Sequence, residues 1–358
     1  MTSRLAVPIA LALTLAALPA RADDAFVLKT QVYADSNDTV VVSPLVALSR
    51  DAWTGGTLSA HYVADVISSA SIDVTSNASR HMADFRSEVA ASMVQRLRAS
   101  TISAGYTYSV EHDYESHGAD LGFQQDLFQR NTTLSVGYGF THNNVGRAGD
   151  RSFHRTLDVH GASISIAQTL GQRMVGSLGY TFSWLDGYQA SPYRFVRING
   201  AMGDWKVPET LPLERARHSI VAGWRRHLFR DSALHIDYRL YLDSWGINAH
   251  TVQLGYFVSF GDVTLRIRER IYYQAAASFF RTSYSADDLP AFVTADKELS
   301  TFWSSITGLK VDWRLPVAHR ALALEAKVDL FYFGYIDYAL LSSRVGADLA
   351  LGLTVVYY

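Results

Sequence analysis

Three arginines alternate along one segment of the chain. Arg266, Arg268 and Arg270 are two residues apart, and the residues around them are mostly apolar. Successive side chains of a β-strand point to opposite faces, so this spacing places all three guanidinium groups on one face. An arginine row along the wall of a channel favours anions. In other segments, the same alternation would place further basic residues on the face that lines the interior of a barrel: Arg217, Arg225, Arg239, Lys310 and Lys327.

Acidic residues with the same inward parity fall on earlier segments: Asp65, Glu88, Glu111, Asp120 and Asp126. Opposed basic and acidic walls would set a transverse field across a lumen. The alternative is that the charges pair and fill the lumen, with Asp237, Glu325, Asp329 and Asp348 as partners of the basic residues. Glu269 is an exception, because strict alternation aims it at lipid; a β-bulge or a position near the membrane interface would explain it.

The segment 186–211 is long and carries aromatic and basic residues, among them Tyr193, Arg194, Phe195 and Arg197. It could fold inward as a constriction of the lumen. It could instead bind an external ligand through its aromatic and basic surface, or be an ordinary solvated loop.

Enzymatic and metal chemistry have little support in the sequence. The chain has no cysteine, which excludes thiolate nucleophiles and zinc–thiolate sites. The G-x-S-x-G, H-E-x-x-H and EF-hand motifs are absent. Ser109, His112, Asp113, His117 and His142 cluster near one predicted edge, but adjacent strand residues face opposite sides. We therefore expect no enzyme, no cofactor and no metal, and the net charge of −2 argues against nucleic-acid binding.

The elements that carry these residues are β-strands. Apolar and small or polar residues alternate with a period of two, as in the segments 102–110 and 322–330. The segments run to about 10 to 16 residues, which is longer than most soluble strands and long enough to cross a bilayer at a tilt. An apolar face alternating with a small, polar face is typical of a transmembrane β-barrel.

The alternation predicts an all-β fold: a transmembrane antiparallel β-barrel of about 16 strands, with roughly 14 to 18 possible. Short turns alternate with longer loops, which indicates short periplasmic turns and longer external loops. The predicted strands lie near 25–35, 39–50, 57–67, 83–97, 100–111, 116–128, 132–142, 155–170, 173–185, 212–229, 233–245, 250–260, 263–279, 300–314, 321–334 and 344–358.

Tryptophans lie near the predicted strand ends. Two aromatic girdles at the headgroup levels would produce this distribution. The predicted girdle residues are Trp53, Trp224 and Trp313 at the periplasmic ends and Trp184, Trp245 and Trp303 at the external ends. The final segment is apolar and aromatic, as expected of a strand that the outer-membrane assembly machinery recognises.

The first 22 residues have the pattern of a cleaved secretory signal peptide. Arg4 supplies a basic region, Leu5 to Leu18 is almost entirely apolar, and Ala20-Arg21-Ala22 fits a cleavage site. The apolar run is too short for a membrane-spanning helix. The sequence thus predicts a leader, residues 1–22, and one outer-membrane barrel domain, residues 23–358.

Five short segments carry a resemblance to a known family: 65–71, 73–76, 106–109, 113–114 and 131–135. Together they resemble an uncharacterised family of Gram-negative outer-membrane β-barrel proteins, a domain of unknown function. It implies the fold and the outer-membrane location. It carries no established activity, so it transfers no functional residue.

The function that these features favour is a pore or export conduit for small polar or anionic solutes. The alternative is a non-conducting structural or adaptor barrel of an envelope or polysaccharide-export complex, and a rim-located hydrolase is a third, weaker option. The expected partners are outer-membrane lipid, lipopolysaccharide and the outer-membrane assembly machinery.

Overall fold

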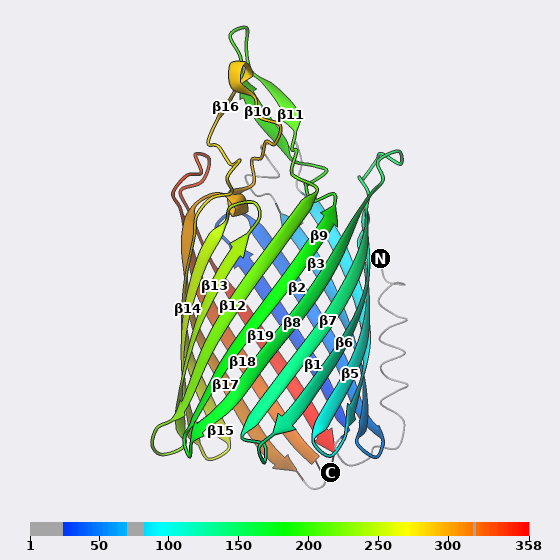
Figure 1. Ribbon diagram of the computed structural model, residues 1–358, viewed down its shortest axis with the longest axis vertical. Coiled ribbons are helices and arrows are strands. Elements are labelled where there is room, and N and C mark those ends of the chain that lie inside the picture. The colour runs from blue at the N-terminus through cyan, green and yellow to red at the C-terminus, as the bar shows by residue number, and fades with distance from the viewer. Residues whose placement is uncertain (1–23, 70–81, 318–319, 358) are drawn as a thin grey trace.

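A computed structural model describes residues 24–69, 82–317 and 320–357 of the chain. The predicted leader and part of the segments that carry the family resemblance lie outside these residues. The described chain forms a closed, antiparallel 16-stranded barrel (Figure 1). Its strands are β1 (Ala25–Asp35), β2 (Thr39–Trp53), β3 (Gly56–Ser69), β4 (Met82–Arg96), β5 (Ser100–Val110), β6 (Tyr114–Leu127), β7 (Thr132–Val145), β8 (Arg155–Gly171), β9 (Met174–Gly187), β12 (Glu214–His227), β13 (Ser232–Asp243), β14 (Asn248–Phe260), β15 (Val263–Gln274), β17 (Phe302–Val317), β18 (Arg320–Tyr335) and β19 (Ser343–Tyr357).

The barrel is apolar on its outer face. Leu121, Ile271 and Leu309 are 62%, 54% and 46% exposed, although they lie within regular strands. Large apolar side chains at such positions are stable only against an apolar phase, which a bilayer supplies. The inner face carries charged, small and hydroxyl-bearing side chains, so the barrel encloses a polar lumen.

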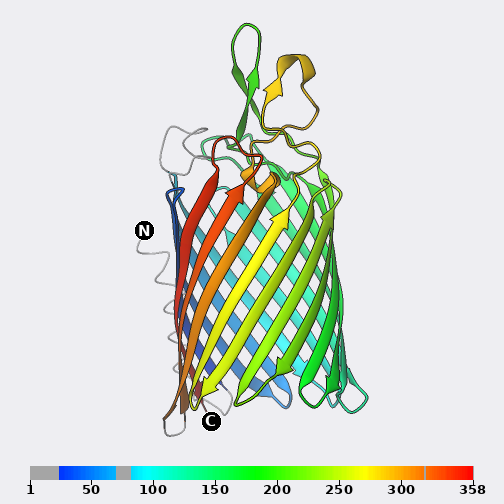
Figure 2. The ribbon, with the colours of Figure 1, turned by 90° about the vertical axis from the view of Figure 1, so that its left-hand side faces the viewer.

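The two ends of the barrel differ. Short turns join strand pairs at one end, which we call the turn end, and the longest connections gather at the other, which we call the loop end (Figures 1 and 2). β1 starts and β19 finishes at the turn end, and the two strands pair along the whole length of β1 and close the barrel. This arrangement matches the expected alternation of short turns and longer loops. No helix within the described ranges is long and apolar enough to span a membrane.

A small module stands above the loop end (Figure 2). It contains a three-stranded sheet of β10 (Phe195–Asn199), β11 (Trp205–Pro208) and β16 (Tyr284–Ser285), and the 3-10 turns η1 (Ala286–Asp288) and η2 (Lys297–Leu299) lie in the same connection as β16. Val196, Ile198 and Val293 form a buried core with Tyr284. We call the sheet and its connections the external module.

Five of the six predicted girdle tryptophans are exposed or half-buried, and the sixth differs. Trp53 and Trp313 near the turn end, and Trp303 near the loop end, are 42–47% exposed, while Trp184 and Trp224 are half-buried. The prediction is wrong for Trp245, which does not lie on the outer face and is only 4% exposed. Its indole N–H donates to the carbonyl of Glu214 (3.0 Å), and its ring stacks under the Arg215 guanidinium, so it anchors the loop end from inside.

Four tyrosine–histidine pairs repeat around the outer face near the loop end. In each pair the phenol oxygen and the imidazole Nδ1 are 2.7–2.8 Å apart, and the two residues lie on neighbouring strands. The tyrosines are 38–49% exposed, on the side of the strands that carries the apolar residues. Each imidazole therefore satisfies a phenol that would otherwise meet an apolar phase. The pairs are Tyr106–His117, Tyr138–His160, Tyr180–His218 and Tyr238–His250.

Glu269 does face outward, and neither expected explanation applies. The pairing of β15 with β14 and β17 continues past it without a bulge. Its cross-strand partner Thr307 lies between Trp303 and Trp313, inside the apolar band. The carboxylate instead accepts hydrogen bonds from Ser305 (2.7 Å) and Thr307 (2.6 Å), which satisfy part of its acceptor capacity.

Candidate functional site

The middle arginine of the row is neutralised by a carboxylate. Arg268 donates to Asp329 at 2.7 Å. Lys327 sits between Asp329 (3.1 Å) and Asp348 (2.8 Å), so positive and negative groups alternate across β15, β18 and β19. For these residues the structure shows charges that pair with one another, which was the alternative to opposed basic and acidic walls.

A second chain of ion pairs runs beside the first. Lys310 contacts Asp312 (2.9 Å) and Glu325 (3.0 Å), and Glu325 also accepts from Lys29 (2.5 Å). On the far side of the row, Arg225 pairs with Asp237 at 2.6 Å. Arg225, Arg268, Lys310 and Lys327 therefore contribute little net charge to the lumen.

Four lumenal arginines have no such partner. Among the residues that the structure describes, no carboxylate lies within ion-pair distance of Arg217, Arg239, Arg266 or Arg270. Arg217 lies opposite Asp243 in the strand register, but that carboxylate is bound by Arg215. We call these four residues the arginine series.

The arginine series descends from the loop end into the lumen on β12, β13 and β15. Arg239 is exposed and donates to Ser219 at 2.8 Å. It lies close enough to Arg270 for the two charges to repel. The Nε atoms of Arg217 and Arg266 are buried without a protein acceptor. The series is thus a line of positive charge that no carboxylate among the described residues neutralises.

The predicted acidic wall is compensated in part. Arg86, which the sequence analysis did not single out, lies between Asp65 (3.5 Å) and Glu88. Asp126 lies near the turn end, accepts from Thr133 (2.9 Å) and is 3.8 Å from Arg130. Asp120 packs over Gly105 instead of pairing with a cation. A signal for Arg86 was present, since its parity matches that of Glu88 on the same strand.

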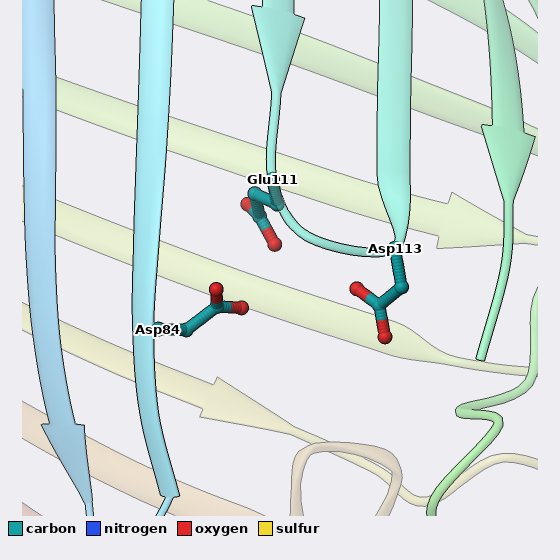
Figure 3. Close-up of side chains that lie close together, drawn as sticks. All are labelled: Asp84, Glu111 and Asp113. Atoms are coloured by element: carbon teal, nitrogen blue, oxygen red, sulfur yellow. The ribbon is translucent and has the colours of Figure 1, made fainter. Parts of the chain in front are cut away.

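Glu111 belongs to an acidic cluster at the loop end. Carboxylate oxygens of Asp84, Glu111 and Asp113 lie within 4.8 Å of one another (Figure 3). Burial, with the neighbouring charge of Asp84, raises the pKa of Glu111 and of Asp113. The oxygen set is of the type that binds hard cations. The geometry alone assigns no ion to it, and we treat it as an electrostatic feature of the loop end.

The β10–β11 hairpin of the segment 186–211 does not fold into the lumen, unlike the constriction that was one of the three alternatives for this segment. Its β10–β11 hairpin, with Phe195 and Arg197, points away from the barrel (Figures 1 and 2). Arg194 lies at the base of the hairpin, between Glu209 (3.1 Å) and Asp296 (3.0 Å). Tyr193 instead reaches back to the barrel and hydrogen-bonds Asp113.

Two clusters of apolar residues, one of which includes Leu211 at the end of the segment 186–211, reduce the opening at the loop end. Leu211, Trp245, Ile247, Ala249, Ala277 and Leu299 form one buried cluster. Phe302, Tyr335 and Tyr338 form a second, beside Tyr272 and Phe280. Buried apolar groups in place of open water show that the loop end is partly closed in this structure.

The proposed rim-enzyme residues do not form one site. Ser109 points into the lumen and accepts from Arg86 Nε at 3.0 Å. His117 and His142 lie on the outer face, with Tyr106 (2.7 Å) and Asp158 (2.6 Å). Within the described chain these side chains form no serine–histidine contact.

Comparison with known families decides the membership of the chain. The family described as "Protein of unknown function (DUF3570)" matches residues 4–160 and 151–332. The chain belongs to the DUF3570 family. No protein of curated function matches the sequence significantly.

Solved structures similar to this DUF3570 protein are outer-membrane barrels. A bacterial polysaccharide outer membrane secretin aligns over 95% of this chain and 100% of its own, with 8% identity and a TM-score of 0.53. The siderophore receptor PirA from Pseudomonas aeruginosa aligns over 93% of this chain with 11% identity and a TM-score of 0.46. OccK5 (OpdH) from the same organism aligns over 94% of this chain and 98% of its own, with 8% identity and a TM-score of 0.47. The chain spans 61% of the length of PirA. At these identities the likeness shows the fold.

Proposed function

We propose that this protein is an outer-membrane pore or conduit that passes small anionic solutes. The observation that carries the proposal is the arginine series. Fixed positive charges on a lumenal wall raise the local concentration of anions and lower the barrier to their passage. A barrel of this strand number has room for an aqueous channel.

The distribution of charge on the lumenal wall of β12, β13 and β15 supports anions over cations, opposite the acidic groups on β4 to β6. The carboxylates on β18 and β19 are bound by lysines and Arg268, and Asp65 and Glu88 share Arg86. The arginine series is not balanced in this way. An anion moving from the loop end would meet Arg217 and Arg239 before Arg270 and Arg266.

A second candidate is favoured by the apolar clusters at the loop end. If these clusters stay in place, the barrel does not conduct and acts as a structural or adaptor component of an envelope complex. In both cases we infer that a cleaved leader, residues 1–22, exports the chain.

Reconstitution into planar bilayers separates the two candidates. The chain with all four arginines of the series changed to glutamine is compared with the wild type in a salt gradient. We expect anion-selective conductance in the wild type and a reversal potential shifted toward cation selectivity in the variant. The control is Arg225→Gln with Asp237→Asn, which removes a compensated pair without changing net charge. Absence of conductance in the wild type would reject the pore and favour the adaptor.

A further inference from the structure

The external module contains a cavity that the pore does not use. It measures about 360 Å³ and lies between the β10–β11 hairpin, the segment 280–284 and the turn 337–340. This volume falls in the range of small-molecule sites. The loop that bears Phe195 and Arg197, which the sequence marked as aromatic and basic, thus forms one wall of this cavity.

Three basic side chains and one acidic side chain line this cavity, and each of the two arginines also pairs with a carboxylate beside the lining. The basic residues are Arg197, Lys206 and Arg281, and the acidic residue is Asp337. Arg197 binds Asp204 through Nε and Nη2, and Arg281 binds Asp288 through Nη1 at 2.8 Å. A guanidinium carries five donors in a planar fork. Each arginine therefore keeps one terminal nitrogen, Nη1 of Arg197 and Nη2 of Arg281, without an acceptor among the described residues.

The rest of the lining combines ring faces with hydrogen-bonding groups. Phe195 and Phe280 are half-buried and border the cavity. Asn199, Thr282 and Ser283 add amide and hydroxyl groups. Aromatic faces beside donors and acceptors suit a ligand with one apolar face and several hydroxyl groups.

The framework of the cavity is held by contacts within the module itself. Tyr284 is 2% exposed, and its hydroxyl accepts from the backbone N–H of Thr294 at 3.0 Å. Arg194 ties the β10–β11 hairpin to Asp296 of the neighbouring connection at 3.0 Å. A preformed site loses little conformational entropy on binding.

We propose that this cavity binds a polyhydroxylated carboxylate, such as an acidic sugar residue, from the outside of the cell. The carboxylate lies against Arg197 and Arg281, the ring of the ligand packs on Phe280, and its hydroxyl groups bond the polar lining. This site is independent of the pore, since it lies above the barrel and not within the lumen.

The test is calorimetric titration of the full-length protein in lipid nanodiscs. The probe is trigalacturonate, and the neutral control ligand is maltotriose. We expect trigalacturonate to bind and the double variant Arg197→Gln/Arg281→Gln to weaken it by about tenfold or more, because two charge-assisted hydrogen bonds are lost. The control variant is Arg151→Gln, an exposed arginine on the connection before β8.

Two further measurements keep the result interpretable. Hydrogen exchange of residues 189–211 shows whether the double variant retains the fold of the module. The variant Arg197→Lys/Arg281→Lys keeps the charge and removes the planar fork, so partial recovery of affinity is expected. Equal affinity for trigalacturonate and maltotriose, no binding of trigalacturonate to the wild type, or full affinity in a folded double variant would overturn the proposal. None of these outcomes depends on conductance.

Discussion

Arg268 and Asp329 meet directly over Gly308. The two residues come from β15 and β18, and β17 between them has glycine at the crossing point. A Cβ atom at Gly308 would lie 2.1 Å from Asp329 Oδ1 and 3.3 Å from Arg268 Nε. The ion pair spans an intervening strand only because that strand has no side chain there.

The change Gly308→Ala should therefore displace Asp329 and break the pair. We expect the free energy of unfolding to fall by about 1–3 kcal/mol, as for a buried polar group that loses its partner. Equilibrium unfolding in guanidinium, with the protein in lipid vesicles, measures this. The matched control is Gly161→Ala on β8, where the nearest atom to a Cβ is 3.9 Å away. An equal loss in both variants would show that glycine content, not the pair, sets the effect.

The acidic cluster at the loop end should make stability depend on pH. The pKa values of Glu111 and Asp113 are raised, so the folded state binds the protons of these two carboxyl groups more tightly than the unfolded state does. The free energy of unfolding therefore falls as the pH rises through the range in which the two groups lose their protons. Asp84→Asn removes part of the repulsion, so its Tm should exceed that of the wild type at about pH 7.5. The difference should vanish at about pH 3.5, where carboxyl groups are protonated. Asp120→Asn changes a carboxylate outside the cluster, and its Tm should not exceed that of the wild type in this pH-dependent way.

Arg194 should hold the external module together. Glu209 is fully buried beside it, and loss of the arginine leaves that carboxylate without its charge partner. We expect Arg194→Ala to destabilise the module locally by about 3–5 kcal/mol, the usual effect of breaking a buried pair. Hydrogen exchange of residues 189–211 should rise while the barrel strands stay protected. Arg197→Ala, at a pair whose arginine is 72% exposed, should cost less than about 1 kcal/mol. Uniform exchange in both variants would contradict the role of Arg194.

The outward tyrosine–histidine pairs should be energetically coupled. For Tyr138 and His160, the single changes Tyr138→Phe and His160→Phe each leave one polar group without its partner. We expect each to cost about 1 kcal/mol and the double change to cost less than the sum, because the two residues share one hydrogen bond. A double-mutant cycle of unfolding in vesicles measures the coupling. Strict additivity would mean that lipid or water satisfies these groups separately.

The strands could be predicted closely from the sequence because lipid and lumen impose a period of two along each strand. β1, for example, has the predicted bounds, and most others differ by one to three residues. The largest difference is β15, which ends at Gln274 and not near residue 279. Ala277 leaves the strand direction to pack in the apolar cluster at the loop end, and the local pattern does not reveal this long-range contact.

The partners of the lumenal charges could not be predicted in the same way. Parity places Arg266, Arg268 and Arg270 on one face, but only the lateral register decides which carboxylate lies beside each. Asp329 lies opposite Gly308, which lies opposite Arg268, so it reaches this arginine and not its neighbours. The direction of the β10–β11 hairpin likewise depends on contacts with a segment about 90 residues away, around Tyr284 and Val293.

The Lys29–Glu325 contact bears on how the protein is assembled. These residues are 296 positions apart, and they meet across Gly352 of β19, at the seam where β1 and β19 join. Before β1 and β19 pair, each of these two strands has a row of unpaired backbone N–H and C=O groups, which are strongly unfavourable in hydrocarbon. Insertion and closure must therefore be coupled. A slip of one residue between β1 and β19 would turn Lys29 to the opposite face and separate it from Glu325. The ion pair therefore stabilises the observed register of the seam.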